Sequence, residues 1–147
     1  MTGLGVSAAA ATVSTVTFTA WALYVTLVEH PARIESGATS ARAQFRGSYR
    51  RAAPWQASFA AITLVTGAIA GLLTGRGLWL VGAVALGAAI PLTLLVIRPV
   101  NTRLLSTEPL SDAETLALLH RWGRLHAIRT CLGGLGLLAV LGALGPR

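Results

Sequence analysis

The sequence predicts an all-α fold, an integral membrane four-helix bundle whose long fourth helix changes from amphipathic to apolar. Hydrophobic residues make up 54% of the 147 residues and charged residues only 12%, about half the charged fraction of a typical soluble domain. The apolar residues also fall into four runs, each long enough to cross a bilayer at about 1.5 Å per residue. We therefore expect residues 1–147 to form a single transmembrane domain.

The four expected spans cover residues 6–28, 54–74, 78–100 and 121–144. The first span lacks a basic start and a clear small-residue cleavage site, so it is expected to be a retained helix and not a signal peptide. It should end at residues 29–31, Glu-His-Pro, because proline disfavours helix in the residue before it. The polar segment 32–53 is expected to be a connection, of which residues 40–51 can form an interfacial helix.

The second and third spans are expected to be antiparallel neighbours. Gly67 and Gly71 form a face of small residues, continued by Gly75, that allows close contact between helices. The run Gly-Arg-Gly at residues 75–77 predicts a tight turn into the third span. Pro91 should kink the third span and free backbone carbonyl groups that a neighbouring helix has to satisfy.

The fourth helix has a clear start signal. A loop is expected over residues 102–110, and Ser111 is then followed three residues later by Glu114, which is the pattern of a capping box. No proline interrupts the chain from this point to about residue 144. The first third of this helix is amphipathic and the rest is apolar.

The charge pattern favours a membrane protein over one that binds nucleic acid. All twelve cationic side chains are arginine and the net charge is +7. Nine of the arginines lie in or beside the connections 32–53 and 101–120, and only Arg76 and Arg147 belong to the other side. By the positive-inside rule these connections are cytoplasmic and both termini are outside, as in a multi-pass protein of the cell (inner) membrane. No basic domain remains to bind nucleic acid.

Motifs of common active sites are absent. There is no GxGxxG followed by an acidic residue, no GxxxxGK, no GxSxG and no CxxC. The single Cys131 excludes a disulfide framework or a cysteine-based metal cluster. Five acidic residues, four of them in polar connections or helix starts, argue against a carboxylate-rich metal centre.

Polar residues from four helix ends are expected to meet at the cytoplasmic end of the bundle. They are His30 at the end of span one, Tyr49 and Gln56 leading into span two, Arg98 and Asn101 at the end of span three, and Trp122, His126 and Arg129 in span four. At 100° per residue the last three share one helix face. A histidine and an arginine at the mouth of an apolar helix are costly to desolvate, so they indicate a site.

Acid–base chemistry is the first use that these residues suggest. His126 would move protons near neutral pH, while Arg129 and Asn101 would stabilise developing negative charge, and no cofactor would be needed.

Metal or haem ligation is the second use. His30 and His126 would be paired ligands of copper or iron, with Glu29 or His120 as a third ligand, although HxxxH, HxH and ExxH spacings are absent. The third use is structural, with these side chains tying helix ends together in a non-catalytic accessory or binding protein. His120 faces away from the Trp122–His126 face, which makes it a weaker candidate for a site residue. Glu29 can pair with the arginine four residues on, which makes it a weaker candidate for a metal ligand.

Three stretches resemble the DUF1772 family of small four-helix membrane proteins, which includes the anthrone oxygenases of aromatic polyketide pathways. They are WALYV at residues 21–25 leading to EHPAR at 29–33, PLTLLVIRPVN at 91–101, and RWGRLHAIRT at 121–130. The resemblance covers nearly the whole chain and implies a membrane oxidoreductase that oxidises an anthrone to an anthraquinone with molecular oxygen.

The resemblance also implies roles for the polar cluster. An anthrone is acidic at its methylene carbon, so a base, His126 or His30, and an oxyanion stabiliser, Arg129 or Asn101, would suffice. The flat, lipophilic substrate would partition into the bilayer. Its expected binding residues are Trp21, Tyr24, Tyr49, Gln56, Arg98 and Trp122. The alternatives are a copper-, iron- or haem-dependent oxidoreductase acting on another substrate and a non-catalytic membrane protein. The glycine faces would also suit contacts in a homo-oligomer.

Overall fold

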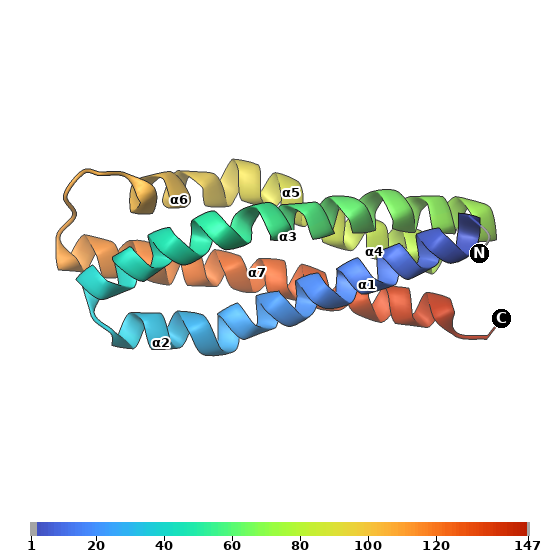
Figure 1. Ribbon diagram of the computed structural model, residues 1–147, viewed down its shortest axis with the longest axis horizontal. Helices are drawn as coiled ribbons and strands as arrows, with labels where there is room; N and C mark the ends of the chain where they lie inside the picture. The colour runs from blue at the N-terminus through green and yellow to red at the C-terminus, as the bar shows by residue number, and fades with distance from the viewer. Residues whose placement is uncertain (1–2, 147) are drawn as a thin grey trace.

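Four long helical rods run side by side in an elongated bundle (Figure 1). The computed structural model describes residues 3–146, and within them the chain forms helices and turns without a strand. The rods cover Gly3–Glu35, Ala38–Thr74, Gly77–Leu105 and Asp112–Leu144, and each is long and apolar enough to cross a membrane. The predicted fold class is confirmed, and the chain is a multi-pass membrane protein. Arg147, one of the two arginines assigned to the sparse side, lies outside the described residues.

The first rod continues past Pro31, so the prediction that it ends there is wrong. It consists of α1 (Gly3–Tyr24), a π-helical segment η1 (Val25–Glu29) and α2 (His30–Glu35). Pro31 falls in the first turn of α2, where a missing backbone N–H is tolerated. The helical residues after Pro31 carry Arg33 into the bundle, where only 2% of the residue is exposed.

The second rod is a single helix, α3 (Ala38–Thr74). The segment 32–53, expected to be a polar connection, is therefore helical except at Ser36 and Gly37. Gly37 has φ of 82°, a value that favours glycine. Arginines on α3 hold the polar part of the helix against the rest of the bundle, because Arg42 and Arg46 both donate to the backbone carbonyls of Leu104 and Ser106.

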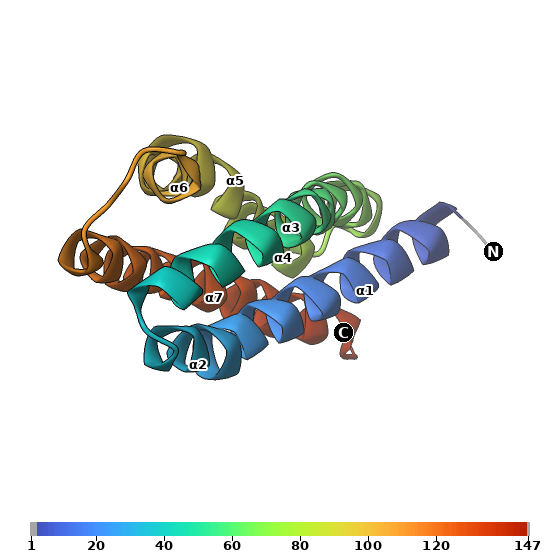
Figure 2. The ribbon, with the colours of Figure 1, turned by 60° about the vertical axis from the view of Figure 1, so that its left-hand side comes forward.

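The third rod is interrupted where Pro91 predicted a kink. It runs through α4 (Gly77–Gly87), α5 (Ala89–Pro91), the π-helical segment η2 (Leu92–Ile97) and α6 (Arg98–Leu105). Figure 2 shows the rod changing direction between α4 and α5. Because a proline lacks an N–H and collides with the carbonyl four residues earlier, the ladder cannot pass it undisturbed.

The turn between the second and third rods is confirmed. Gly75 caps α3 in the left-handed conformation with φ of 66°, and α4 starts at Gly77. The two rods pack closely, as the small-residue face predicted: a Cβ atom at Gly67 would lie 3.1 Å from the Cβ of Ala83, and one at Gly71 would lie 2.7 Å from a methyl group of Leu80.

The fourth rod is the uninterrupted helix α7 (Asp112–Leu144). The predicted capping box is present: the backbone N–H of Glu114 donates to Ser111 Oγ at 3.2 Å, and the Ser111 N–H donates to the Glu114 carboxylate at 2.9 Å. The loop before it is shorter than expected, since α6 continues to Leu105.

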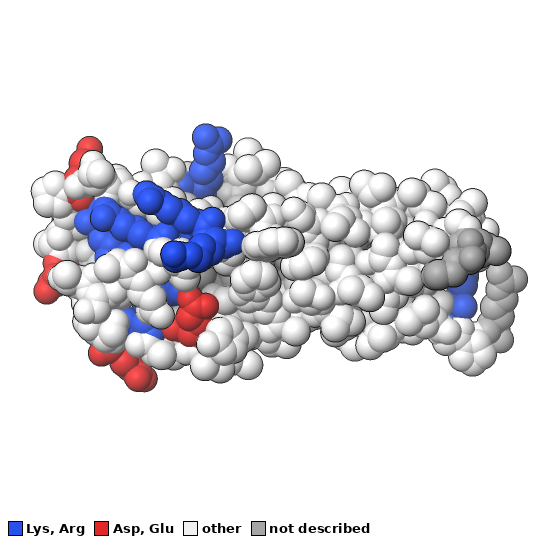
Figure 3. Space-filling model, viewed as in Figure 1, with Lys and Arg blue, Asp and Glu red and all other residues white. Residues whose placement is uncertain are grey.

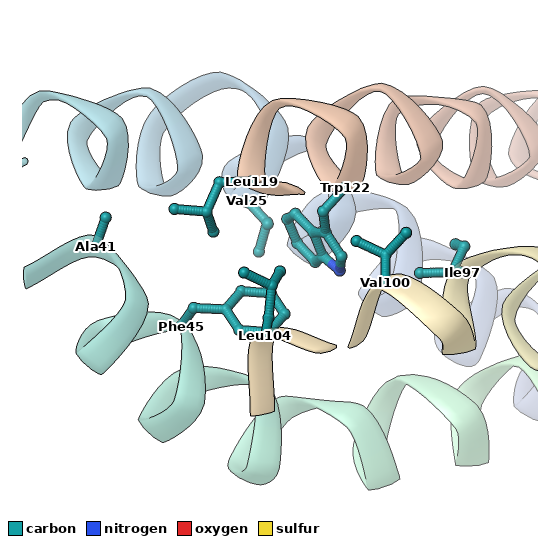
Figure 4. Close-up of a cluster of buried hydrophobic side chains, with 8 residues drawn as sticks. All are labelled: Val25, Ala41, Phe45, Ile97, Val100, Leu104, Leu119 and Trp122. Carbon is teal, nitrogen blue, oxygen red and sulfur yellow. The ribbon is translucent and has the colours of Figure 1, made fainter. Parts of the chain in front are cut away.

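Most of the arginines gather at one end of the bundle, and both chain ends lie at the other (Figures 1 and 3). Beneath the arginines lies the largest apolar cluster, to which all four rods contribute (Figure 4). Its buried members are Val25, Ala41, Phe45, Ile97, Val100, Leu104, Leu119 and Trp122.

We expect Gly82→Ala to destabilise the bundle, because α4 and α7 nearly touch there. A Cβ atom at Gly82 would lie 2.8 Å from a methyl group of Val140 and 3.2 Å from the carbonyl oxygen of Gly136. The cost of such overpacking is typically about 1–3 kcal/mol. Gly134→Ala is the matched control, since no atom lies within 4 Å of the added methyl group and the intrinsic gain in helix propensity is the same. Thermal unfolding in detergent should give a lower midpoint for Gly82→Ala alone, and equal midpoints would contradict this packing.

Candidate active site

A pocket opens inside the arginine-rich end, between the first, second and fourth rods. Its walls are Val25, Glu29, Arg33, Phe45, Ser48, Tyr49, Ala52, Ala53, Gln56, Trp122, His126 and Arg129. The empty space amounts to about 370 Å³, including the part that is open to the outside. Sites for small molecules combine apolar walls with a few polar groups, as this pocket does.

His126 is the buried histidine of this pocket. It is only 2% exposed, and its ring stacks on Trp122, one helical turn earlier on α7, with 4.7 Å between centroids and 10° between planes. Neither ring nitrogen makes a hydrogen bond of normal geometry within the described part of the chain, and the backbone of Ala22 on α1 is the group that interacts with the ring most nearly as a hydrogen-bond partner. Buried polar atoms are nearly always paired, so an unpaired imidazole in the wall of a pocket is positioned to act on a ligand.

Arg129 adds a positive charge to the same pocket. It is 8% exposed and donates one hydrogen bond of 2.9 Å from Nη2 to the side-chain oxygen of Gln56. Its guanidinium group lies over the ring of Phe18, 5.5 Å from the centroid, and its Nε has no partner. No carboxylate among the described residues forms an ion pair with it. The neighbouring groups therefore hold this charge without neutralising it.

Arg33 is a pocket residue that the sequence analysis missed. It forms an ion pair with Glu29, donates to Ser48 Oγ at 3.0 Å, and lies 5.5 Å from the ring centroid of Phe45 and 5.7 Å from that of Trp122. The i,i+4 spacing of Glu29 and Arg33 predicted the ion pair, which is confirmed. The expected helix end at Pro31 concealed the burial of the pair.

His30 lies beside the pocket but is not one of its walls. Its ring contacts Trp122 at 5.3 Å between centroids, and its Nδ1 is 3.4 Å from Nη1 of Arg33. The opposite edge of the ring presses on Gly123, where a Cβ atom would collide with Nε2. The absence of a side chain at Gly123 thus lets the His30 ring contact α7. Both histidine rings lie against Trp122, but only His126 lines the cavity.

Tyr49 and Asn101 form a hydrogen-bonded pair. Tyr49 lines the pocket, and Asn101 Nδ2 donates to its hydroxyl oxygen at 2.9 Å. Asn101 is 3% exposed but is not a wall of the pocket, so any effect it has on a ligand passes through Tyr49. The Tyr49 hydroxyl accepts this bond and keeps its own proton available for donation.

Three expected substrate-binding residues do not reach the pocket. Tyr24 is 55% exposed, Arg98 is exposed, and the half-buried Trp21 packs against the apolar cluster instead. The π-helical segment η1 begins directly after Tyr24, and its wider turn changes the direction of the side chains that follow it. Val25 and Glu29 face the pocket in place of the Trp21 and Tyr24 stripe. His120 is exposed, in agreement with its expected position away from the site.

Of the two histidines that the metal or haem hypothesis pairs, only His126 is a wall of the pocket. His30 is outside the cavity that His126 faces, and two guanidinium groups line that cavity, which disfavours a bound cation. Within residues 3–146, no group of three or more His, Cys, Asp or Glu side chains is arranged to hold a metal ion.

Comparison with known proteins links this pocket to a family. The model that describes anthrone oxygenases matches residues 45–139, which include Tyr49, Gln56, Trp122, His126 and Arg129. Comparisons with curated proteins and with solved structures gave no match. Because the matched region covers well over half of the chain and agrees with the resemblance of its motifs, this four-helix membrane protein belongs to the anthrone oxygenase family.

Proposed function

We propose that this protein is a membrane oxygenase that oxidises a lipophilic anthrone-type aromatic, of the kind made by polyketide pathways, with molecular oxygen. The observation that carries the proposal is the buried His126, which makes no hydrogen bond of normal geometry at either ring nitrogen and stacks on Trp122 in the wall of the pocket. The family supplies the reaction class. His126 is the group in this pocket best suited to take a proton from an acidic carbon.

The reaction balances without a further reductant. His126 takes a proton from the methylene carbon, and the resulting enolate transfers an electron to oxygen and combines with it to form a C–O bond. Return of the proton to the outer oxygen gives a hydroperoxide. Loss of the second methylene proton with cleavage of the O–O bond then releases water and leaves the carbonyl group. One substrate and one oxygen molecule give one quinone and one water.

Other pocket residues support binding and charge stabilisation in this scheme. Arg129 faces the negative charge of the enolate, and the Tyr49 hydroxyl, held by Asn101, donates to a substrate oxygen. Trp122 and Phe45 are perpendicular aromatic walls, 5.2 Å apart between centroids with an interplanar angle of 82°. A flat polycyclic substrate packs favourably against such surfaces.

Replacing His126 by glutamine should lower the turnover of 1,8-dihydroxyanthrone by at least about 100-fold, the usual effect of losing a general base. The measurement is oxygen uptake together with anthraquinone formation, corrected for the spontaneous rate. His120→Gln is the matched control, since it makes the same change at an exposed position of the same helix. His30→Gln should retain more activity than His126→Gln, because His30 lies outside the pocket.

Two results would contradict the proposal. If wild-type protein oxidises the anthrone no faster than the spontaneous rate, the proposed reaction is refuted. If a folded His126→Gln variant turns over as fast as His120→Gln, the assignment of His126 as the base is refuted.

We also propose that the pocket lies at the cytoplasmic end of the bundle, with both termini outside. The arginine asymmetry supports this orientation by the positive-inside rule. In a Cys131→Ala background, a membrane-impermeant maleimide added to intact cells should label Gly77→Cys, in the turn at the arginine-poor end, and not Thr107→Cys, in the loop at the other. Both positions are exposed. The reverse labelling pattern would invert the orientation.

A further inference from the structure

We propose that the pocket holds its ligand as an anion against Arg129, and that Gln56 is the positioning residue that leaves the charge of Arg129 free for this purpose. The inference rests on the proposed function for the class of ligand, a polycyclic aromatic with an acidic hydroxyl or enol. It adds a residue that decides which ionisation state of such a ligand is bound.

The two arginines of the pocket differ in whether a carboxylate neutralises their charge. Arg33 is paired with the carboxylate of Glu29, so together they contribute no net charge. Arg129 has no carboxylate partner among the described residues, and its one hydrogen bond goes to the neutral amide of Gln56. The walls of the pocket consequently carry one uncompensated positive charge, located at Arg129.

An uncompensated guanidinium group inside an apolar helix bundle is costly. Part of the cost is offset by the face of the Phe18 ring and by the bond to Gln56. The Nε–H group of Arg129 is a buried donor without an acceptor. An anionic ligand oxygen would supply both the missing charge and the missing acceptor.

Gln56 holds the guanidinium group in place through its side-chain oxygen. It is 4% exposed and comes from α3, so the bond of 2.9 Å fixes Arg129 across the bundle axis between the second and fourth rods. A glutamate would make the same contact with almost the same shape, but it would neutralise the arginine and repel a second anion. The amide therefore gives orientation without consuming charge.

The position of Arg129 fits a ligand that combines an anionic group with apolar rings. A second pocket, with about 420 Å³ of empty space including its open part, meets the first one at Tyr49, Ala53, Gln56 and Arg129. Its other walls are almost entirely apolar: Ala57, Ala60, Ala89, Ile90, Thr93 and Leu94. The charged group thus lies where the cavity that contains His126 adjoins a second, apolar one.

The test uses 2-hydroxyanthraquinone, whose absorption band moves to longer wavelength when its phenol ionises. Bound to the full-length wild-type protein in detergent, the dye should reach half-ionisation at least one pH unit below its value in the same detergent alone, a tenfold preference for the anion. Gln56→Glu should abolish this shift and weaken binding of the anion at least about tenfold. Glu29→Gln, which removes the negative partner of Arg33, should preserve or enlarge the shift.

Matched controls separate charge from structure. Gln44→Glu makes the same chemical change at an exposed position of α3 and should leave the dye titration unchanged. Unsubstituted anthraquinone, which carries no charge, should bind wild type and Gln56→Glu with equal affinity. Loss of its binding to Gln56→Glu would show a structural effect and overturn the assignment.

The inference is also overturned if the dye does not bind to wild type, or if it titrates on wild type as in detergent alone. An unchanged dye titration on Gln56→Glu would remove the role of Gln56. These readouts need no turnover, so they remain informative if anthrone oxidation is not found. A positive dye result without oxidation would refute the proposed reaction and leave the anion site standing.

Discussion

The burial of positive charge in an apolar bundle is the constraint on which the pocket depends. Each buried guanidinium group has to be held by polar partners, because an isolated charge in this environment would be prohibitively costly. Arg33 joins α2 to α3 through Ser48 and is paired with Glu29 of its own rod, and Arg129 joins α7 to α3 through Gln56. The same contacts that satisfy the arginines therefore determine where the helices of this end stand, and with them the walls of the pocket.

Two π-helical segments adapt the first and third rods to this arrangement. Segment η1 ends one residue before His30, and η2 follows directly on Pro91. A π-helical turn widens the helix and changes the direction in which later side chains point, and such turns are frequent at functional sites. On the first rod this change brings Val25, Glu29 and Arg33 to face the bundle interior.

The features that the sequence predicted correctly are governed by local rules. Apolar run length predicted the four rods, the spacing of Ser111 and Glu114 predicted the start of α7, and glycines predicted the turn at residues 75–77. The Trp122, His126 and Arg129 face was also correct, because an uninterrupted helix keeps its periodicity. Arg33 was missed since its burial depends on Phe45 and Ser48 of another rod, which no local rule connects to it. The predicted helix end at Pro31 was wrong because a proline in the first turn of a helix does not interrupt it.

The net positive charge of the pocket and the support for the proposed base, His126, come from different rods. The region that matches the anthrone oxygenase family begins at residue 45 and so leaves out the first rod. The matched region supplies His126, the proposed base, and Arg129, the source of the net positive charge. It also supplies Gln56, which holds Arg129 in place. The first rod supplies Arg33, neutralised by its own neighbour Glu29. Since Arg33 lies against Trp122, and Trp122 stacks on His126, this neutral pair supports the orientation of the imidazole without altering the charge that a ligand meets.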